Sequence, residues 1–377
     1  MIEIREIKTR GEKREFLNFP DRLYKDNPCY VPPLAADERK IFSKKYAYYE
    51  TCDAIYFGAW RDGKMVGRVS GIIQRASNEK HGEKRVRFTR LDGIDDAEVF
   101  SALMDAVEKW GAERGMDTIC GPLGFSDFER EGLLVEGFDR LSTFEEQYNA
   151  EYYGKYLEQN GYEKEVDWTE SMIRPPKDYD GSLDKLSDFV LKRYKLHIGT
   201  AKNIRQFIKK YSDGFFSLID TAYADIYGTV PFTESMKKMM LKNFKLIVDM
   251  KHVVIILDEN ENVVCLGLCF PSIARAVQKS GGRITPAALV RLLHAIKHPK
   301  IIDLGLVAAD PKYMNCGISA VVSAALLHML SEDGVEYAET NLNLEDNYAI
   351  QNQWKRFDAE MHKRRRAYVK KIREAGK

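Results

Sequence analysis

The sequence lacks any long apolar run: none of its 377 residues belongs to a stretch approaching about 18 uncharged apolar residues. The N-terminus, MIEIREIKTR, is charged from the start and lacks the apolar core of a secretory signal. We therefore expect neither a membrane span nor export. The sequence predicts a cytoplasmic protein without a membrane partner.

Cysteine is scarce and scattered. The six cysteines are Cys29, Cys52, Cys120, Cys265, Cys269 and Cys316. The closest pair, Cys265 and Cys269, lies in an apolar, strand-like run with no further Cys or His beside it, so a zinc site is the weaker reading. A chain this long needs no disulfide framework, and we predict buried, reduced thiols and no metal.

An excess of either charge is also missing, because 58 Lys and Arg face 57 Asp and Glu, for a net charge of +1. This balance argues against a uniformly basic nucleic-acid binder and against an acidic solvating tail. Hydrophobic residues make up 44% and charged residues 31%, which is ordinary for a packed globular protein. The length exceeds what one hydrophobic core supports, so two domains are expected.

Hydrophobic periodicity predicts the same order of elements in both halves of the chain. In the first half the predicted strands are 2–7, 54–60, 65–73, 84–91, 118–121 and 164–173, and the helices are 11–25, 96–114 and 150–159. Residues 174–187 combine prolines, glycine and charge and are predicted to be a linker. In the second half the strands are 194–198, 253–257, 263–270, 300–308, 337–342 and 364–370, with helices up to 245 and at 318–330 and 347–357. This repeat predicts an α/β fold of two tandem domains, 1–175 and 188–377, each a mixed, mostly antiparallel sheet flanked by helices.

The stretch IIDLGLVAADPKYMNCGISAVVSAALLHML, residues 301–330, carries the clearest chemical signal. A strand runs into a short turn holding Pro311 and Gly317, and a small-residue helix follows directly. Backbone N–H groups without intrahelical partners and the helix dipole make such a junction an anion site that suits a pyrophosphate. Lys312 is the nearby cation, and Ser319 could add a hydroxyl. Many strand–turn–helix junctions that contain a glycine share this pattern without binding phosphate.

The strand, the turn DPKYMNCGISA and the helix resemble the acetyl-CoA motif of the GNAT superfamily of N-acetyltransferases. Gly317 matches the motif, whereas Met314 and Ser319 depart from its usual residue types. The resemblance implies that acetyl-CoA, as co-substrate, lies on residues 307–320 and near the Asn that begins the next helix. The implied cofactor-binding residues are Val307, Ala308, Lys312, Met314, Asn315, Cys316, Gly317, Ile318, Ser319 and Asn347.

The first half is similar to the same superfamily with a complementary set of features. NAEYYGKYLEQNGYEK has a Tyr seven residues after Asn149, at Tyr156, where many members keep an acid; the second half has Trp354 at that position. The loop before the main helix of the first half, LDGIDDAEV, places Asp92, Asp95 and Asp96 where phosphates would lie. The resemblance therefore implies a degenerate first domain without a cofactor. Strings such as FPDRLYKDNPCYVPPL and EGLLVEGFD resemble a bacterial family of tandem GNAT-like proteins over nearly the whole chain.

The resemblance also implies catalytic candidates. Glu339 lies on the strand where the superfamily often keeps its base, and a salt-bridged strand glutamate is the alternative. Tyr348 and Tyr368 are the candidate acids, with core or rim tyrosines as the alternative. Cys316 is expected to be a packed thiol rather than a nucleophile, and His328 a core histidine. The loop 121–149 either closes over a cleft between the domains or packs their interface.

The function implied is acyl-CoA-dependent N-acyl transfer, with acetyl-CoA as donor and direct attack by an unidentified small-molecule or peptide amine. One alternative is a non-catalytic acyl-CoA-binding or scaffold protein. Another is an aminoacyl transferase of the Fem type, which also uses two GNAT-like domains. No marked basic surface favours tRNA binding, so a nucleic-acid partner is not expected.

Overall fold

The computed structural model describes residues 1–372, which form two compact units. Unit 1 comprises Met1–Trp168, Ala274–Leu289 and the chain from Lys363 onward; unit 2 comprises Thr169–Ile273 and Val290–His362. Each unit has its own hydrophobic core, around Phe88 and Phe100 in unit 1 and around Ile256 and Val321 in unit 2. Within the described residues, no helix combines the length and apolar character needed to cross a bilayer.

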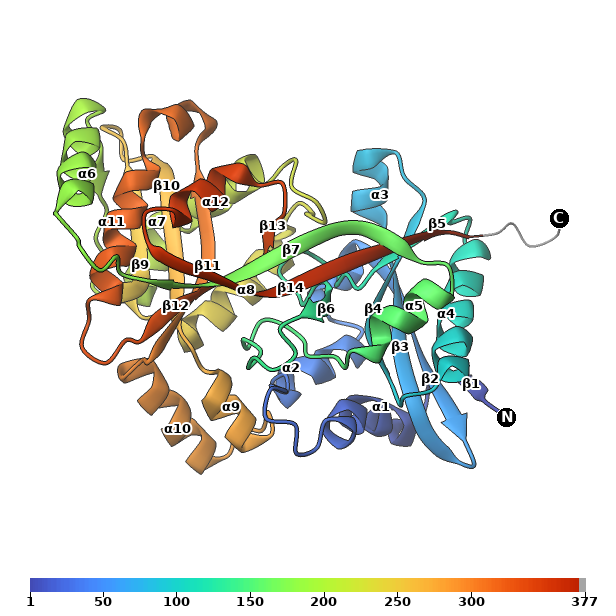
Figure 1. Ribbon diagram of the computed structural model, residues 1–377. Helices are drawn as coiled ribbons and strands as arrows, with labels where there is room; N and C mark the ends of the chain where they lie inside the picture. The colour runs from blue at the N-terminus through green and yellow to red at the C-terminus, as the bar shows by residue number, and fades with distance from the viewer. Residues whose placement is uncertain (373–377) are drawn as a thin grey trace. The chain divides into compact units, whose positions relative to one another are not determined.

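The sheet of unit 1 has four antiparallel strands and then a parallel one (Figure 1). The strands in order are β1 (Glu3–Glu6), β2 (Cys52–Arg61), β3 (Lys64–Gln74), β4 (Arg85–Gly93), β5 (Thr118–Gly121) and the end of β14 (Asp358–Lys371), with β6 (Leu133–Glu136) also paired to β14. Asp62 and Gly63 make the predicted β2–β3 turn, with φ angles of 51° and 75°. The strands β4 and β5 run parallel, because α4 connects them.

Helices cover both faces of this sheet. The helix α4 (Ala97–Ala112) approaches closely because glycines face it: a Cβ on Gly67 would lie 2.7 Å from Val99 Cγ1. The next side chain along β3, Arg68, points to the opposite face and donates to the carbonyl of Phe16 in α1 (Arg10–Leu23). The remaining helices of unit 1 are α2 (Ala35–Glu38), η1 (Arg39–Phe42), η2 (Ala47–Glu50), α3 (Arg75–His81), α5 (Tyr152–Gln159) and α9 (Ala274–Ser280).

Unit 2 repeats this topology. Its strands in order are β8 (His197–Ile198), β9 (Val253–Leu257), β10 (Val263–Pro271), β11 (Ile301–Ala309), β12 (Tyr337–Thr340) and the end of β7 (Glu163–Arg174), with β13 (Asn343–Leu344) paired to β7. Its helices are α6 (Ser182–Arg193), α7 (Ile204–Ala222), α8 (Glu234–Ile247), η3 (Met250–His252), most of α10 (Pro286–Lys297), η4 (Pro311–Cys316), α11 (Ser319–Leu330) and α12 (Tyr348–Trp354). Again the first four strands are antiparallel, and β11 and β12, joined through α11, are parallel. The duplicated α/β fold with mixed, mostly antiparallel sheets is thus confirmed.

Each unit takes a strand from the other half of the chain. The strand β7 begins in unit 1 and ends in unit 2, beside β12, whereas β14 begins in unit 2 and ends in unit 1, beside β5. The division 1–175 and 188–377 follows chain order, but the compact units are discontinuous. The predicted linker 174–187 is wrong in its second half, because α6 starts at Ser182 and buries Leu183 and Val190 in the core it shares with α11.

Candidate active site

Two neighbouring parallel strands separate in unit 2. The strands β11 and β12 pair from Ile301 and Tyr337 to Leu304 and Thr340, and the N–H of Asn341 donates to the carbonyl of Leu304 at 3.2 Å. Beyond this point β11 continues to Ala309 paired with β10 only. The edge of β11 that follows Leu304 is therefore not covered by β12, and its backbone groups face the opening between the two strands.

A β-bulge marks the point of separation. The register of β11 against β10 skips Gly305, between Leu304 and Leu306. A Cβ at position 305 would lie 2.2 Å from Cε2 of Phe270, so the site requires glycine. The hydroxyl of Tyr223, at the end of α7, donates to the carbonyl of Val307 at 3.0 Å and so occupies one backbone group of this stretch.

The predicted strand–turn–helix junction follows β11. The carboxylate of Asp310 accepts from the N–H of Lys312 at 2.9 Å and starts η4, and Gly317 then adopts a left-handed conformation with φ of 77°. No side chain caps the first turn of α11. The N–H groups of Ala320 and Val321 donate to the carbonyls of Gly317 and Ile318 at 2.9 and 3.0 Å, so the groups left for an anion are those of the turn ahead of Ala320. Together with the positive end of the dipole of this twelve-residue helix, that turn suits an anionic group such as a pyrophosphate.

The predicted cofactor-binding residues differ in what they can offer. Lys312, Met314 and Asn315 are exposed, and Val307, Cys316, Gly317 and Ser319 are half-buried. Ala308 and Ile318 are buried in the core and can contribute only backbone groups. Asn347 caps α12, where its side-chain oxygen accepts from the N–H of Ile350 at 3.2 Å.

A buried carboxylate and an imidazole meet near the separated strands. Glu339 is 5% exposed, and its Oε1 lies 3.1 Å from Nε2 of His362, whose side chain is also buried. Asp303, the register partner of Glu339 on β11, is buried too. Burial raises the pKa of the Cys269 thiol to about 12, and the charge of Asp303 adds to this shift. A carboxylate beside an imidazole can accept and pass on a proton.

The sequence prediction included Glu339 but missed His362, which the structure places at the beginning of β14. Tyr348 belongs to the same unit as Glu339 and is 69% exposed at the start of α12. Tyr368 lies in unit 1, where it is buried and its hydroxyl donates to Glu158 at 3.1 Å. The structure therefore does not gather the three predicted catalytic residues in one unit.

Two further residues, Cys316 and His328, have their short polar contacts outside the Glu339–His362 pair. The thiol of Cys316 is 3.8 Å from the carbonyl of Lys312, within its own turn. The prediction of His328 as a core histidine is wrong: its side chain is 69% exposed and lies 2.9 Å from Asp184. No described group of Cys, His, Asp and Glu is arranged to hold a metal ion.

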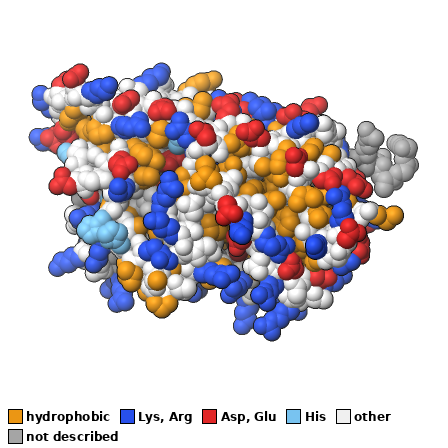
Figure 2. All heavy atoms as spheres, turned by 60° about the horizontal axis from the view of Figure 1, so that its bottom comes forward, with side chains coloured by type: hydrophobic (Ala, Val, Ile, Leu, Met, Phe, Trp, Pro, Cys, Tyr) orange, Lys and Arg blue, Asp and Glu red, His pale blue; other side chains and the backbone are white. Residues whose placement is uncertain are grey.

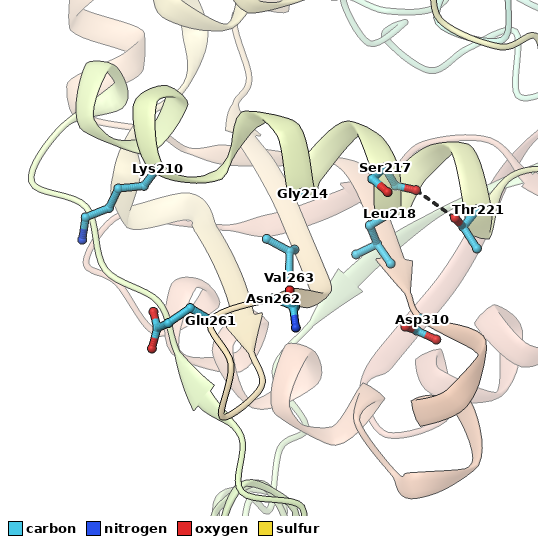
Figure 3. Close-up of a pocket in the computed structure, with 9 residues that line it drawn as sticks. All are labelled: Lys210, Gly214, Ser217, Leu218, Thr221, Glu261, Asn262, Val263 and Asp310. Atoms are coloured by element: carbon cyan, nitrogen blue, oxygen red, sulfur yellow. Dashed lines mark hydrogen bonds between the residues drawn. The ribbon is translucent and has the colours of Figure 1, made fainter.

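A pocket of about 310 Å³ lies between α7 and the β9–β10 turn, and Asp310, which starts η4, is part of its lining (Figure 3). Its lining consists of Lys210, Gly214, Ser217, Leu218, Thr221, Glu261, Asn262, Val263 and Asp310. Two carboxylates, Glu261 and Asp310, and one ammonium group, Lys210, give the lining a mixed charge. This balance suits a polar or cationic group better than a phosphate.

The corresponding turn of unit 1 is closed by its own acidic residues. Asp92 pairs with Arg68 at 2.8 Å, and Asp95 accepts from the hydroxyl of Tyr156 at 2.6 Å. Asp96 caps α4 through the N–H of Glu98 and pairs with Arg61. The start of α4 is thus satisfied by carboxylates, in contrast to the start of α11.

Unit 1 also buries a carboxyl group that no sequence pattern indicated. Glu131, in the loop 121–149, is 4% exposed, and its Oε1 has no hydrogen-bond partner among the described residues. Burial raises the pKa of Glu131 well above its usual range, with Asp127, Glu146 and Glu129 adding to the shift and Arg87 opposing it. The direction of this shift favours the neutral, protonated form of Glu131 inside unit 1.

Replacing Glu131 with glutamine is expected to raise the free energy of unfolding at pH 8 by about 1–2 kcal/mol. Above the ordinary glutamate pKa of 4.5, the unfolded chain gains free energy by ionising this carboxyl, whereas the folded chain keeps the proton. The wild type therefore loses stability as the pH rises above 4.5, and a glutamine does not. Denaturant unfolding at several pH values should show the gain vanish near pH 4.5, while the exposed Glu79→Gln changes little throughout. A gain that is independent of pH would contradict the neutral state of Glu131.

Two repeats, each a mostly antiparallel sheet with one parallel strand pair joined through a helix, have the fold of a tandem GNAT protein. A solved tandem GNAT protein from the clavulanic acid biosynthesis pathway shares it over 100% of both chains, with a TM-score of 0.56 at 11% identity. No protein-family model matches the chain.

Two curated proteins are similar in sequence. Protein YghO of Escherichia coli K12 is 28% identical over 98% of this chain and 95% of its own length. A bacterial ceramide synthase of Caulobacter vibrioides is 25% identical over 77% of this chain and 75% of its own length.

Proposed function

We propose that the protein is an acyl-CoA-dependent N-acyltransferase with its reaction centre in unit 2. The observation that carries this proposal is the separation of β11 from β12 directly ahead of the uncapped start of α11. The backbone of the turn at Gly317 and the dipole of α11 bind the pyrophosphate, and the uncovered edge of β11 receives the pantetheine arm. Bound acyl-CoA supplies a thioester as the acyl donor.

Glu339 serves as the general base in this proposal. It accepts the proton that the amine loses as nitrogen bonds to the thioester carbonyl carbon and the carbon–sulfur bond breaks. His362, 3.1 Å away, orients the carboxylate and can carry the proton onward. Tyr348 remains the predicted acid for the leaving sulfur, since Trp354 replaces the usual tyrosine and its indole N–H donates to Asn343.

Several acyl donors and amines are candidates. Acetyl-CoA is the donor that the sequence predicted. The name of the ceramide synthase relative denotes an amide of a long-chain amino alcohol, which adds fatty acyl-CoA and long-chain amines to the candidates. A non-catalytic acyl-CoA-binding protein is the second candidate, because Asn347 and Trp354 are both engaged within the fold.

Replacing Gly317 with glutamate is expected to weaken the binding of acetyl-CoA and CoA by about 100-fold or more, because a carboxylate then faces the pyrophosphate. Calorimetric titration of the full chain measures this effect. Gly334→Glu is the matched control, since Gly334 also has a positive φ, 91°, and has no neighbour within 4 Å of an added Cβ.

If Gly317→Glu and Gly334→Glu bind acetyl-CoA equally well, the cofactor does not bind at the Gly317 turn. If the wild type binds, release of free thiol with a panel of amines tests the transfer, and Glu339→Gln should slow it by about 10²–10⁴-fold without changing acyl-CoA affinity. Binding without turnover would favour the non-catalytic candidate, and transfer that requires tRNA would favour the Fem type.

A further inference from the structure

One segment of the chain is basic, although the chain as a whole is balanced in charge. No Asp or Glu occurs between Asn262 and Ile302, whereas 57 acidic residues oppose 58 basic ones overall. The cations of this segment are Arg275, Lys279, Arg283, Arg291, Lys297 and Lys300. The segment contains α9 and α10, the two helices between β10 and β11.

The helix α10 carries an exposed apolar stripe. Leu289, Val290 and Leu293 are 48%, 67% and 50% exposed, and Pro286 is exposed too. Their spacing of three, four and seven residues from Pro286 places them on one face of a single continuous helix. Ile284, just ahead of the helix, is 54% exposed.

The opposite face of α10 packs against the rest of the protein. Ala288 is fully buried, and Leu292, Ala295 and Ile296 are half-buried. The helix is thus apolar on both faces, and only the inner face is packed within the described chain. A stripe of this size on the outside of a helix indicates an interaction surface.

Cations flank the stripe along the chain. Arg275, Lys279, Arg283 and Lys297 are exposed, and none of them lies within ion-pair distance of a described carboxylate, whereas Lys300 pairs with Glu336 at 3.3 Å. Figure 2 turns the end of the molecule that carries α9 and α10 toward the viewer and shows Lys, Arg and His side chains around hydrophobic ones at its lower left.

We propose that this surface docks on an anionic lipid bilayer, with Leu289, Val290 and Leu293 in the headgroup region and the flanking cations on the phosphates. An exposed apolar stripe with basic residues on either side in the chain combines the two features that bind such interfaces, apolar side chains for the headgroup region and cations for the anionic lipids. From Pro286 to Leu293 the stripe extends over about 10 Å, which suits shallow burial of a helix lying in the plane of the membrane.

The charge distribution favours a membrane over a second copy of the chain. A two-fold symmetric contact through α10 would bring the same exposed cations of both copies together, and their repulsion opposes it. The prediction of no membrane partner rested on the lack of a spanning run, and that criterion does not bear on a helix that lies at the interface. The inference stands on α9 and α10 and does not depend on acyl transfer.

Vesicle sedimentation with the full chain tests the proposal. The protein should bind phosphatidylcholine vesicles that contain phosphatidylserine about ten-fold or more tightly than pure phosphatidylcholine vesicles, and added salt should weaken this binding. The double variant Val290→Asp/Leu293→Asp should lose it by about ten-fold or more. Both positions are exposed, and unchanged thermal unfolding would show that the variant is folded.

Phe189→Asp is the matched control, because Phe189 is 61% exposed on α6 but follows Asp188. It should bind the vesicles as the wild type does. The proposal is overturned if the wild type does not prefer the anionic vesicles, or if the double variant binds them like the wild type. Equal loss in Phe189→Asp would also overturn it, as would light scattering that shows the double variant turning a dimer into a monomer without changing vesicle binding.

Discussion

Replacing Asp92 with alanine is expected to lower the free energy of unfolding by about 3–5 kcal/mol, because it leaves the Arg68 guanidinium buried without its counter-ion. The two side chains are 8% and 7% exposed, and Arg68 Nε lies 2.8 Å from the Asp92 carboxylate. The other oxygen of Asp92 accepts from the hydroxyl of Tyr24 at 3.0 Å, so this buried hydroxyl also loses an acceptor and keeps only its contact with the hydroxyl of Tyr153 at 2.6 Å. Denaturant unfolding measures the loss.

Two further variants separate the ion pair from a general loss of packing. Replacing both partners, as Arg68→Met/Asp92→Leu, should cost clearly less than Asp92→Ala, because neither charge then remains buried. Glu259→Ala removes the exposed pair with Lys195, whose side chains are 59% and 72% exposed, and should change stability by about 1 kcal/mol or less. If the double variant is as unstable as Asp92→Ala, the cost is not that of an unpaired charge.

The acidic residues at the turn of unit 1 serve the fold instead of leaving room for a cofactor. Asp92, Asp95 and Asp96 lie where the corresponding turn of unit 2 presents helix N–H groups, and each is used within the fold. An acyl-CoA at this turn would have to displace a buried ion pair and a helix cap. The cost of removing Asp92 is therefore also a measure of how firmly unit 1 is committed to a structural role at this position.

Local patterns predicted the parts of the fold that depend on neighbouring residues. The Asp62-Gly63 turn, the alternating strands on either side of it, and the junction from β11 through Gly317 to α11 all formed as expected. Each depends on backbone preference or on periodicity over a few residues, which sequence reading detects well. The repeat itself was visible for the same reason.

The sequence could not predict features that depend on pairing between residues far apart in the chain. The strand β14 was expected near residues 364–370, but nothing in HKRRRAY indicates that its end pairs with β5 in unit 1. His362 became part of the candidate site because the same strand starts in unit 2, beside Glu339. Glu131 was hidden for a related reason, since only tertiary packing turns a loop glutamate into a buried acid.

The segment 272–299 had no predicted element, although it contains α9 and α10. Gly281, Gly282 and Pro286 interrupt it and are typical of a loop. Apolar residues on both faces of α10 also weaken the period that identifies a surface helix. The exposed residues Leu289, Val290 and Leu293 thus both hid the helix from the sequence pattern and form its apolar outer surface.

Replacing Gly282 with alanine is expected to lower the free energy of unfolding by about 3 kcal/mol or more. Gly282 has a φ of 67°, and an added Cβ would lie 2.1 Å from the carbonyl oxygen of Pro33, a backbone atom that cannot turn aside. The carbonyl of Gly282 also accepts from the N–H of Ala35 at 2.9 Å, so a shift that relieves the clash breaks this bond. Left-handed strain of about 1–2 kcal/mol adds to the clash.

The adjacent glycine is a close control for this change. Gly281 has a φ of 55° but no neighbour within 4 Å of an added Cβ, so Gly281→Ala should show the left-handed strain alone, about 1–2 kcal/mol. Thermal or denaturant unfolding of both variants isolates the contact with Pro33 as their difference. Because Gln278 on the same segment donates to the carbonyls of Pro28 and Tyr30, a large difference would show that α9 and the turn before α10 are held firmly against residues 28–35 within unit 1. If the two variants are equally stable, this segment is free to shift, and the apolar stripe on α10 would then be presented by a movable helix instead of a fixed one.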